Sequence, residues 1–153
     1  AGSSVWYGCI LRGDYNTIRV GARSNLQDGT VVHIDSRTFG AEIGDDVTVG
    51  HMCLIHACTL ESGSFVGNKA CVLDGAVVET GAMVAAGALV TPNKRVPAGE
   101  LWGGSPAAKL RDLTPAQRAS LTLTAKAYAA FAAEHRAACA GLAAPARLGR
   151  ALA

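Results

Sequence analysis

The sequence predicts an all-β solenoid, a parallel β-helix, followed by a C-terminal α-helix. Three observations predict this fold: a six-residue apolar repeat, glycines at a fixed offset from many of the repeated positions, and a helix-start signal after the repeat ends. At 153 residues the chain has the length of one domain. Half of its residues are apolar but only 5% are aromatic, which favours many small packing units.

Valine, leucine or isoleucine recurs every six residues in three phased runs. A fixed short period of this kind is typical of repeat architectures. Three short strands per coil would form a triangular prism, with one aliphatic side chain of each strand in its interior. The repeated positions, called anchors below, are Val20, Leu26, Val32, Ile43, Val49, Ile55, Leu60, Val66, Val72, Val78, Val84, Val90 and Val96.

A glycine stands three residues after many anchors. Because glycine adopts positive φ without steric cost, each of these residues can turn a corner between strands. They are Gly29, Gly63, Gly75, Gly81, Gly87 and Gly99. The repeat slips twice: an insertion within Asp35–Glu42 is expected to loop out of the prism, and the step from Ile55 to Leu60 is one residue short. The first coil has no polar cap, so we expect either upstream residues or a neighbouring chain to cover it.

We predict a β-helix domain over 1–106, a helical segment over 107–141 and a poorly ordered tail over 142–153. The repeat ends in a segment rich in glycine and proline. Thr114 and Gln117 then form the pattern of an N-cap with a capping box. Apolar and aromatic residues follow at helical spacing and predict a face that packs on the prism or on a partner. They are Leu121, Ala125, Tyr128 and Ala132, with His135 on the same face.

Composition argues against several classes of protein. The formal net charge of +2 is spread along the chain, without the basic stripe that binding to nucleic acid needs. No apolar run approaches the ~18 residues of a membrane span, and no leader pattern is found, so we expect a cytoplasmic protein that does not enter membranes. The five cysteines form no CxxC pair and are expected to be small buried residues without disulfide bonds.

Three of the four histidines lie close together in the repeat: His33, His51 and His56. Side chains alternate along a strand, so a residue directly after an inward anchor points outward. His33 follows Val32 and His56 follows Ile55. We therefore expect these two imidazoles to stack on one outer face, one inter-strand spacing of roughly 4.8 Å apart. At that separation two imidazoles can share a metal ion.

His51 stands two residues after Val49, at a corner, and is expected to point away from the other two histidines. If all three bind one ion, the third must come from a neighbouring chain, and triangular prisms would close as a homotrimer. Three neutral nitrogen ligands with an open fourth position describe a catalytic zinc, which lowers the pKa of bound water to about 7. The alternative is that these are unconnected surface residues, as we expect for His135.

The motifs that carry a family resemblance are Leu11-Arg12-Gly13-Asp14, Ser24–Gly29, His33, Gly50-His51 with His56, and Leu101–Pro106. Over roughly residues 3–135 the chain resembles the gamma-class carbonic anhydrases. The resemblance implies a left-handed parallel β-helix, a homotrimer, and Zn²⁺ at the subunit interfaces, with Co²⁺ or Fe²⁺ as possible substitutes. It also implies reversible hydration of carbon dioxide to bicarbonate.

The resemblance further assigns roles to single residues. Arg12 and Asp14 match an interface salt bridge that fixes the geometry of the bicarbonate site. Gln27 matches a glutamine that hydrogen-bonds the metal-bound water, and as the residue after Leu26 it should point outward. Asn25 matches a residue that orients the substrate. An ordinary surface ion pair for Arg12 and turn chemistry for Asn25 are the alternatives.

Two further residues carry open assignments, and two features depart from the family. Asp28 would orient Arg12 or stabilise a turn, and Tyr128 is a candidate hydrogen-bond donor near the metal or a packing residue. Tyr15 stands where the founding enzyme has a glutamate, and the acidic proton-shuttle loop is reduced to Asp35–Glu42. We therefore expect a slow hydratase.

Two other functions stay open at this point. Hexapeptide repeats also occur in enzymes that process acyl-CoA, as transferases or thioesterases, and such an activity would survive metal chelation. The second alternative is a non-catalytic assembly protein, as some relatives are when their metal ligands are lost. The presence of all three histidines argues against it.

Overall fold

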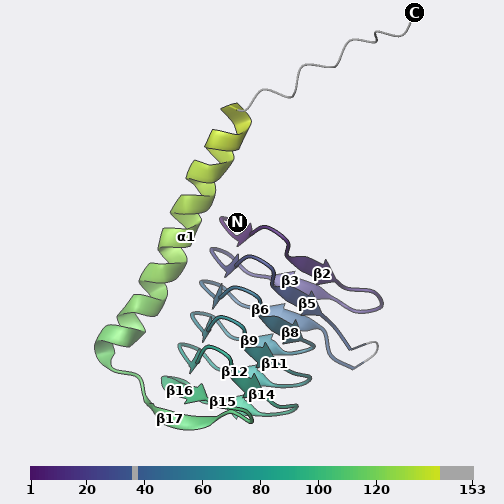
Figure 1. Cartoon of the computed structure of the whole chain (residues 1–153), viewed down its shortest axis with the longest axis vertical. Helices are drawn as coiled ribbons and strands as arrows, with labels where there is room; N and C mark the ends of the chain where they lie inside the picture. The colour runs from purple at the N-terminus through teal and green to yellow at the C-terminus, as the bar shows by residue number, and fades with distance from the viewer. Residues whose placement is uncertain (36–37, 142–153) are drawn as a thin grey trace, which may run out of the picture.

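The computed structural model describes residues 1–35 and 38–141; the predicted tail over 142–153 lies outside the described residues. Consecutive strands of the chain belong to three different sheets in turn. Each coil therefore contributes one short strand to each face of a prism (Figure 1). The strands of successive coils pair in parallel, and among the described residues only the last pair, β16 with β17, is antiparallel. The predicted parallel solenoid with a C-terminal helix is confirmed.

The three faces of the prism are named sheets A, B and C. Sheet A contains, in spatial order, β1 (Ser4–Val5), β4 (Asn25–Leu26), β7 (Thr48–Val49), β10 (Phe65–Val66), β13 (Met83–Val84), β16 (Glu100–Gly103) and β17 (Ala108–Asp112). Sheet B contains β14 (Leu89–Val90), β11 (Cys71–Val72), β8 (Leu54–His56), β5 (Val31–His33) and β2 (Ile10–Arg12). Sheet C contains β15 (Arg95–Val96), β12 (Val77–Val78), β9 (Thr59–Leu60), β6 (Ala41–Ile43) and β3 (Ile18–Val20).

The anchors form the interior of the prism, as predicted. From Leu26 to Val96 every anchor is at most 3% exposed, and Val20 is half-buried against the same core. Strands of two or three residues suffice because each needs only one inward side chain. The hydrophobic effect therefore fixes which residue of every strand points inward, and the residues on either side of it must point outward.

The corners share one backbone conformation. The six predicted corner glycines all have positive φ, between 64° and 72°. Other residue types adopt the same conformation at the same offset from an anchor, among them Asp46, Met52, Lys69 and Asn93, with φ between 55° and 60°. Position in the coil therefore decides the turn, and glycine is only the residue that makes it at the lowest cost.

A second group of glycines allows successive coils to approach closely. Gly21, Gly44, Gly50 and Gly67 directly follow anchors. A Cβ atom on Gly67 would lie 2.5 Å from the backbone nitrogen of Ala86 in the next coil. No side chain fits such a space, so glycine is required here by contact and not by φ. Sequence analysis did not single out this group.

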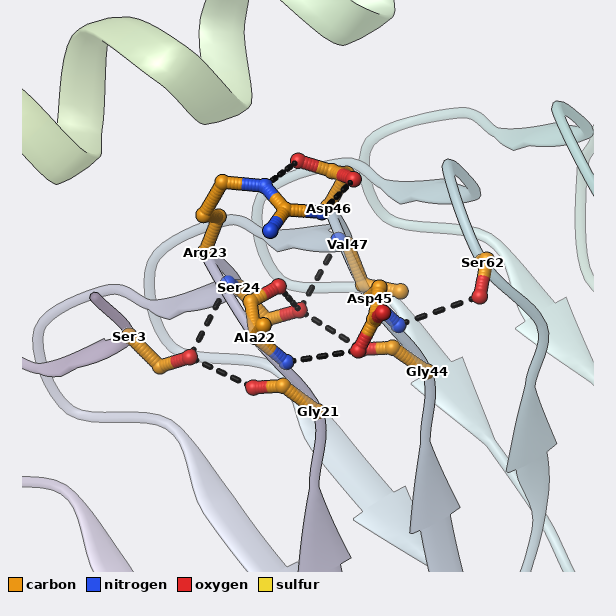
Figure 2. Close-up of polar contacts among 10 residues, drawn as sticks. All are labelled: Ser3, Gly21, Ala22, Arg23, Ser24, Gly44, Asp45, Asp46, Val47 and Ser62. Carbon is orange, nitrogen blue, oxygen red and sulfur yellow. Dashed lines mark hydrogen bonds and ion pairs between the residues drawn. The ribbon is translucent and has the colours of Figure 1, made fainter. Parts of the chain in front are cut away.

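The corner between sheets C and A is tied by polar side chains (Figure 2). The hydroxyl of Ser24 donates to the carbonyl of Gly44 (2.6 Å) and accepts from the amide of Val47 (3.0 Å). Arg23 makes two hydrogen bonds to the carboxylate of Asp46 in the next coil, at 2.7 and 2.6 Å. These contacts link equivalent corners of adjacent coils.

The C-terminal segment covers sheet A. Strand β17 turns back and pairs with β16 in antiparallel fashion, within the range predicted to be helical. The helix α1 (Pro115–Gly141) then begins with the predicted capping box, since the amide of Gln117 donates to the hydroxyl of Thr114 at 3.2 Å. It lies along β1, β4 and β7 (Figure 1). Leu121 and Ala125 are buried on its predicted apolar face.

Membrane spans and disulfides can be assessed for residues 1–35 and 38–141. This part of the chain has no helix that is long and apolar enough to cross a membrane. Cytoplasmic location stays a prediction. The five cysteines carry free thiols; Cys53 and Cys58 are buried as predicted, whereas Cys139 is exposed. Burial raises the pKa of Cys58 to about 12, so this thiol stays protonated and unreactive.

The same substitution should cost different amounts of stability in the two groups of glycine. Gly67→Asn should destabilise the protein by about 1–3 kcal/mol or more, because the new side chain collides with the backbone of the next coil. Gly81→Asn should cost less than about 1 kcal/mol, since asparagine tolerates positive φ and no atom lies within 4 Å of the new Cβ. Chemical denaturation of both variants measures the difference, and equal losses would contradict the assignment.

The Arg23–Asp46 pair predicts an acid-dependent contribution to stability. Hydrogen bonding to Arg23 holds the pKa of Asp46 below its ordinary value of 3.8. A lowered carboxylate pKa stabilises the folded state above the ordinary pKa, and this contribution is lost as the pH falls through the folded value. The melting temperature of the wild type should therefore exceed that of Asp46→Asn at about pH 6, and the difference should shrink towards about pH 3. An unchanged difference, or the same pH dependence in an Arg23→Gln background, would contradict this explanation.

Candidate metal centre

Most of the predicted site residues gather in two places, at opposite ends of the strands of sheet B. One group lies where β5 and β8 end and the chain turns towards sheet C; we call it the histidine-pair edge. It contains Arg12, Asp14, His33, His56 and Asp74. The other lies in and beside the turns that lead from sheet A to sheet B; we call it the Gln27 corner. It contains Asn25, Gln27, Asp28 and His51.

At the histidine-pair edge, His33 and His56 occupy equivalent positions of paired strands. Their Cα atoms are register partners, and their ring centroids lie 5.0 Å apart. Nδ1 of His33 faces Nε2 of His56 at 3.0 Å. The predicted stack of two imidazoles on one outer face is therefore confirmed. It arises because each histidine directly follows a buried anchor, Val32 or Ile55.

A carboxylate contacts the other ring nitrogen of each histidine in this pair. Nε2 of His33 lies 2.8 Å from an Asp14 carboxylate oxygen, and Nδ1 of His56 contacts the carboxylate of Asp74. Arg12 pairs with Asp14 within the same chain. The sequence motifs did not predict Asp74. The signal that could have found it is the repeat itself, because Val72 pairs with Ile55 and so places the following corner beside His56.

The Gln27 corner holds the third histidine. Nδ1 of His51 lies 3.1 Å from the carboxylate of Asp28. Within the chain, therefore, Asp28 pairs with His51, and Arg12 pairs with Asp14. Nε2 of Gln27 donates to Oδ1 of Asn25 at 3.1 Å, and Asn25 in turn donates to Thr48 at 2.9 Å. Gln27 and Asn25 are buried, at 5% and 1% exposed.

Tyr128 lies over sheet A, on the side of the Gln27 corner. Its ring packs edge-on against Trp6, with centroids 5.8 Å apart. Trp6 directly follows β1, and Gln27 directly follows β4, the strand paired with β1. In the single chain, Tyr128 therefore packs against the residue that follows β1, and its role as a hydrogen-bond donor stays a prediction. Tyr15, in contrast, is 88% exposed beside Asp14.

The histidine-pair edge has two imidazole nitrogens at a spacing that suits a shared metal ion. Two nitrogen ligands that each lie about 2.0–2.1 Å from a tetrahedral zinc are roughly 3.4 Å apart, close to the observed 3.0 Å. Histidine ligands generally donate their other N–H to a carboxylate, and both members of the pair contact one. Within residues 1–35 and 38–141, no three His, Cys, Asp or Glu side chains of one chain are arranged so that they could hold a metal ion.

Comparisons with known proteins agree with this geometry. No family model matches the chain. It is 48% identical over 141 residues to gamma carbonic anhydrase 1, mitochondrial, of Arabidopsis thaliana. The aligned region covers 89% of this chain and 51% of the relative. It is 40% identical over 126 residues to a protein of Methanocaldococcus jannaschii named "Probable carbonic anhydrase", covering 82% of the chain and 79% of that protein.

A solved structure adds evidence on the fold. The crystal structure of a hexapeptide transferase family protein from Anaplasma phagocytophilum superposes with a TM-score of 0.84 at 46% identity, over 88% of this chain and 78% of the other. The chain spans about half the length of the plant relatives it matches. Taken with the paired histidines and the repeat, these similarities show that the chain belongs to the gamma carbonic anhydrase family.

Proposed function

We propose that this chain catalyses the reversible hydration of carbon dioxide to bicarbonate, with Zn²⁺ held at the interfaces of a homotrimer. The observation that carries the proposal is the division of the site. A carboxylate-supported pair, His33 and His56, lies at one edge of sheet B, while His51 and Gln27 lie at the opposite edge. Family membership supports the activity.

Because the three histidines lie at two separate places of one chain, assembly of several chains would be needed to bring them together. A head-to-tail contact between identical chains brings different surfaces together, and such contacts form a ring when the rotation closes. A prism with three faces suits a three-membered ring. His51 of each chain would then approach the His33–His56 pair of the next, and three equivalent sites would form. The same contact would bring Gln27 to the metal side.

The residues of the chain would hold and prepare the reactants. His33, His56 and the neighbour's His51 would bind the metal, Zn²⁺ or alternatively Co²⁺ or Fe²⁺, through neutral imidazoles. When bound, such a metal lowers the pKa of a water molecule to about 7, which makes that water a nucleophile for carbon dioxide. The bond from Gln27 to Asn25 fixes the amide, so that it can orient the reacting water. Arg12, exposed beside Asp14, can attract bicarbonate.

Hydration also releases one proton, which must leave the site. Only seven positions, 34–40, separate β5 from β6, where the family's long acidic loop would stand. Tyr15 lies in solvent beside Asp14 and has no carboxylate to offer. We therefore propose a slow enzyme whose proton transfer depends on buffer or on another group of the chain.

The first test is the loss of one metal ligand. His56→Ala should lower both the bound zinc and the rate of carbon dioxide hydration by about 10-fold or more, because the metal loses one of its ligands. Zinc content by elemental analysis and stopped-flow hydration measure both. His135→Ala, on the helix, is the matched control and should change neither.

The same samples separate the alternative functions. Hydration that is unchanged in His56→Ala would exclude the proposed site. Turnover of an acyl-CoA that survives chelation would show a transferase or thioesterase instead. A protein that assembles fully but neither binds zinc nor hydrates carbon dioxide would be a non-catalytic assembly protein.

A second test asks whether the site is shared between chains. His51→Ala and His56→Ala should each bind no zinc alone, because every interface lacks one ligand. When equal amounts are unfolded and refolded together, about one quarter of the interfaces combine an intact His51 with an intact pair, so about one quarter of the zinc and activity should return. A mixture that recovers nothing, while refolded wild type recovers fully, would show that the histidines do not meet across chains.

A further inference from the structure

The side chain of Asp74 reaches the second ring nitrogen of His56. The carboxylate contacts Nδ1, on the side of the ring away from His33, whose Nδ1 faces Nε2 of His56. His56 is thus held between two partners on opposite nitrogens. The side chain of His56 is 26% exposed and that of Asp74 is 41% exposed, so the contact lies at the surface end of the pair.

The backbone around Asp74 is fixed by its neighbouring coils. The carbonyl of Asp74 accepts from the amide of Asn93 at 2.8 Å, and the amide of Gly75 donates to the carbonyl of Ala57 at 2.8 Å. Gly75 has a φ of 66°, and a Cβ at this position would collide with Asn93. The carboxylate is therefore presented to His56 from a corner that is bonded to the coils on both sides.

Each of the three candidate ligands has its own carboxylate partner. Asp14 contacts His33, Asp28 contacts His51 and Asp74 contacts His56. A carboxylate on the second nitrogen of a metal-binding histidine fixes which nitrogen is free to bind and how the ring is oriented. Without Asp74, the ring of His56 would lose the partner that keeps Nε2 turned towards His33.

We propose that Asp74 is a positioning residue for the metal site: its carboxylate holds Nδ1–H of His56 and thereby presents Nε2 to the metal. The inference rests on the proposed function, because it requires that the protein binds a metal through His56. It adds a residue that lies three coils away from the Arg12 motif and outside all motifs of the family resemblance. Asp74 itself need not touch metal or substrate.

The test is zinc affinity, measured by competition with a chromophoric chelator. Asp74→Ala should weaken zinc binding by about 10–100-fold, the usual cost of losing such a partner. Asp74→Asn should lose less, because its amide oxygen can still accept from Nδ1–H. Asp45→Asn is the control: it removes the same charge from a corner on the other side of the prism, and should leave the affinity unchanged.

A second readout separates positioning from general damage. The visible spectrum of the Co²⁺-loaded protein should change in Asp74→Ala, because the ligand field responds to the orientation of His56, while the melting temperature of the metal-free protein should not change. Equal zinc affinity and equal spectra in wild type and both Asp74 variants would overturn the inference alone. A wild type that binds no zinc would overturn the proposed function and this inference with it. If Asp74→Ala does not fold, Asp74→Asn decides, and an unchanged affinity in it counts against the inference.

Discussion

The parallel hydrogen-bond register between successive coils is the constraint on which the rest of the structure depends. It places equivalent positions of each coil directly above one another, as with Arg12, His33 and His56 on sheet B. The buried anchors decide which residue of each strand points inward. Side chains next to an anchor must then form rows on the outside of the prism. The histidine pair is one such row.

Most of the fold could be predicted because it depends on local period. The anchors, the corner glycines and the capping box are each visible within a few residues, and the structure confirms them. Strand β17 could not be predicted, because its antiparallel pairing with β16 depends on where the chain returns after the last coil. The close approach at Gly67 was also hidden, since it depends on the backbone of the next coil.

The candidate site, too, could be predicted from the sequence only in part. The stacking of His33 and His56 follows from the repeat alone, and the contrary position of His51 follows from its offset to Val49. The partners of these histidines did not follow. The repeat does not predict that Asp28 lies beside His51 in the single chain, and Asp74 carries no motif. Contacts between corners of adjacent coils depend on side-chain reach, which a period does not encode.

Strands β5 and β6 are each held by pairing with strands of neighbouring coils. Residues can be added to or removed from the connection between them without changing the register of these strands. The scaffold and the chemistry beside it can therefore change independently in evolution. Insertions and deletions between β5 and β6 can accumulate in a lineage while the paired strands keep their register.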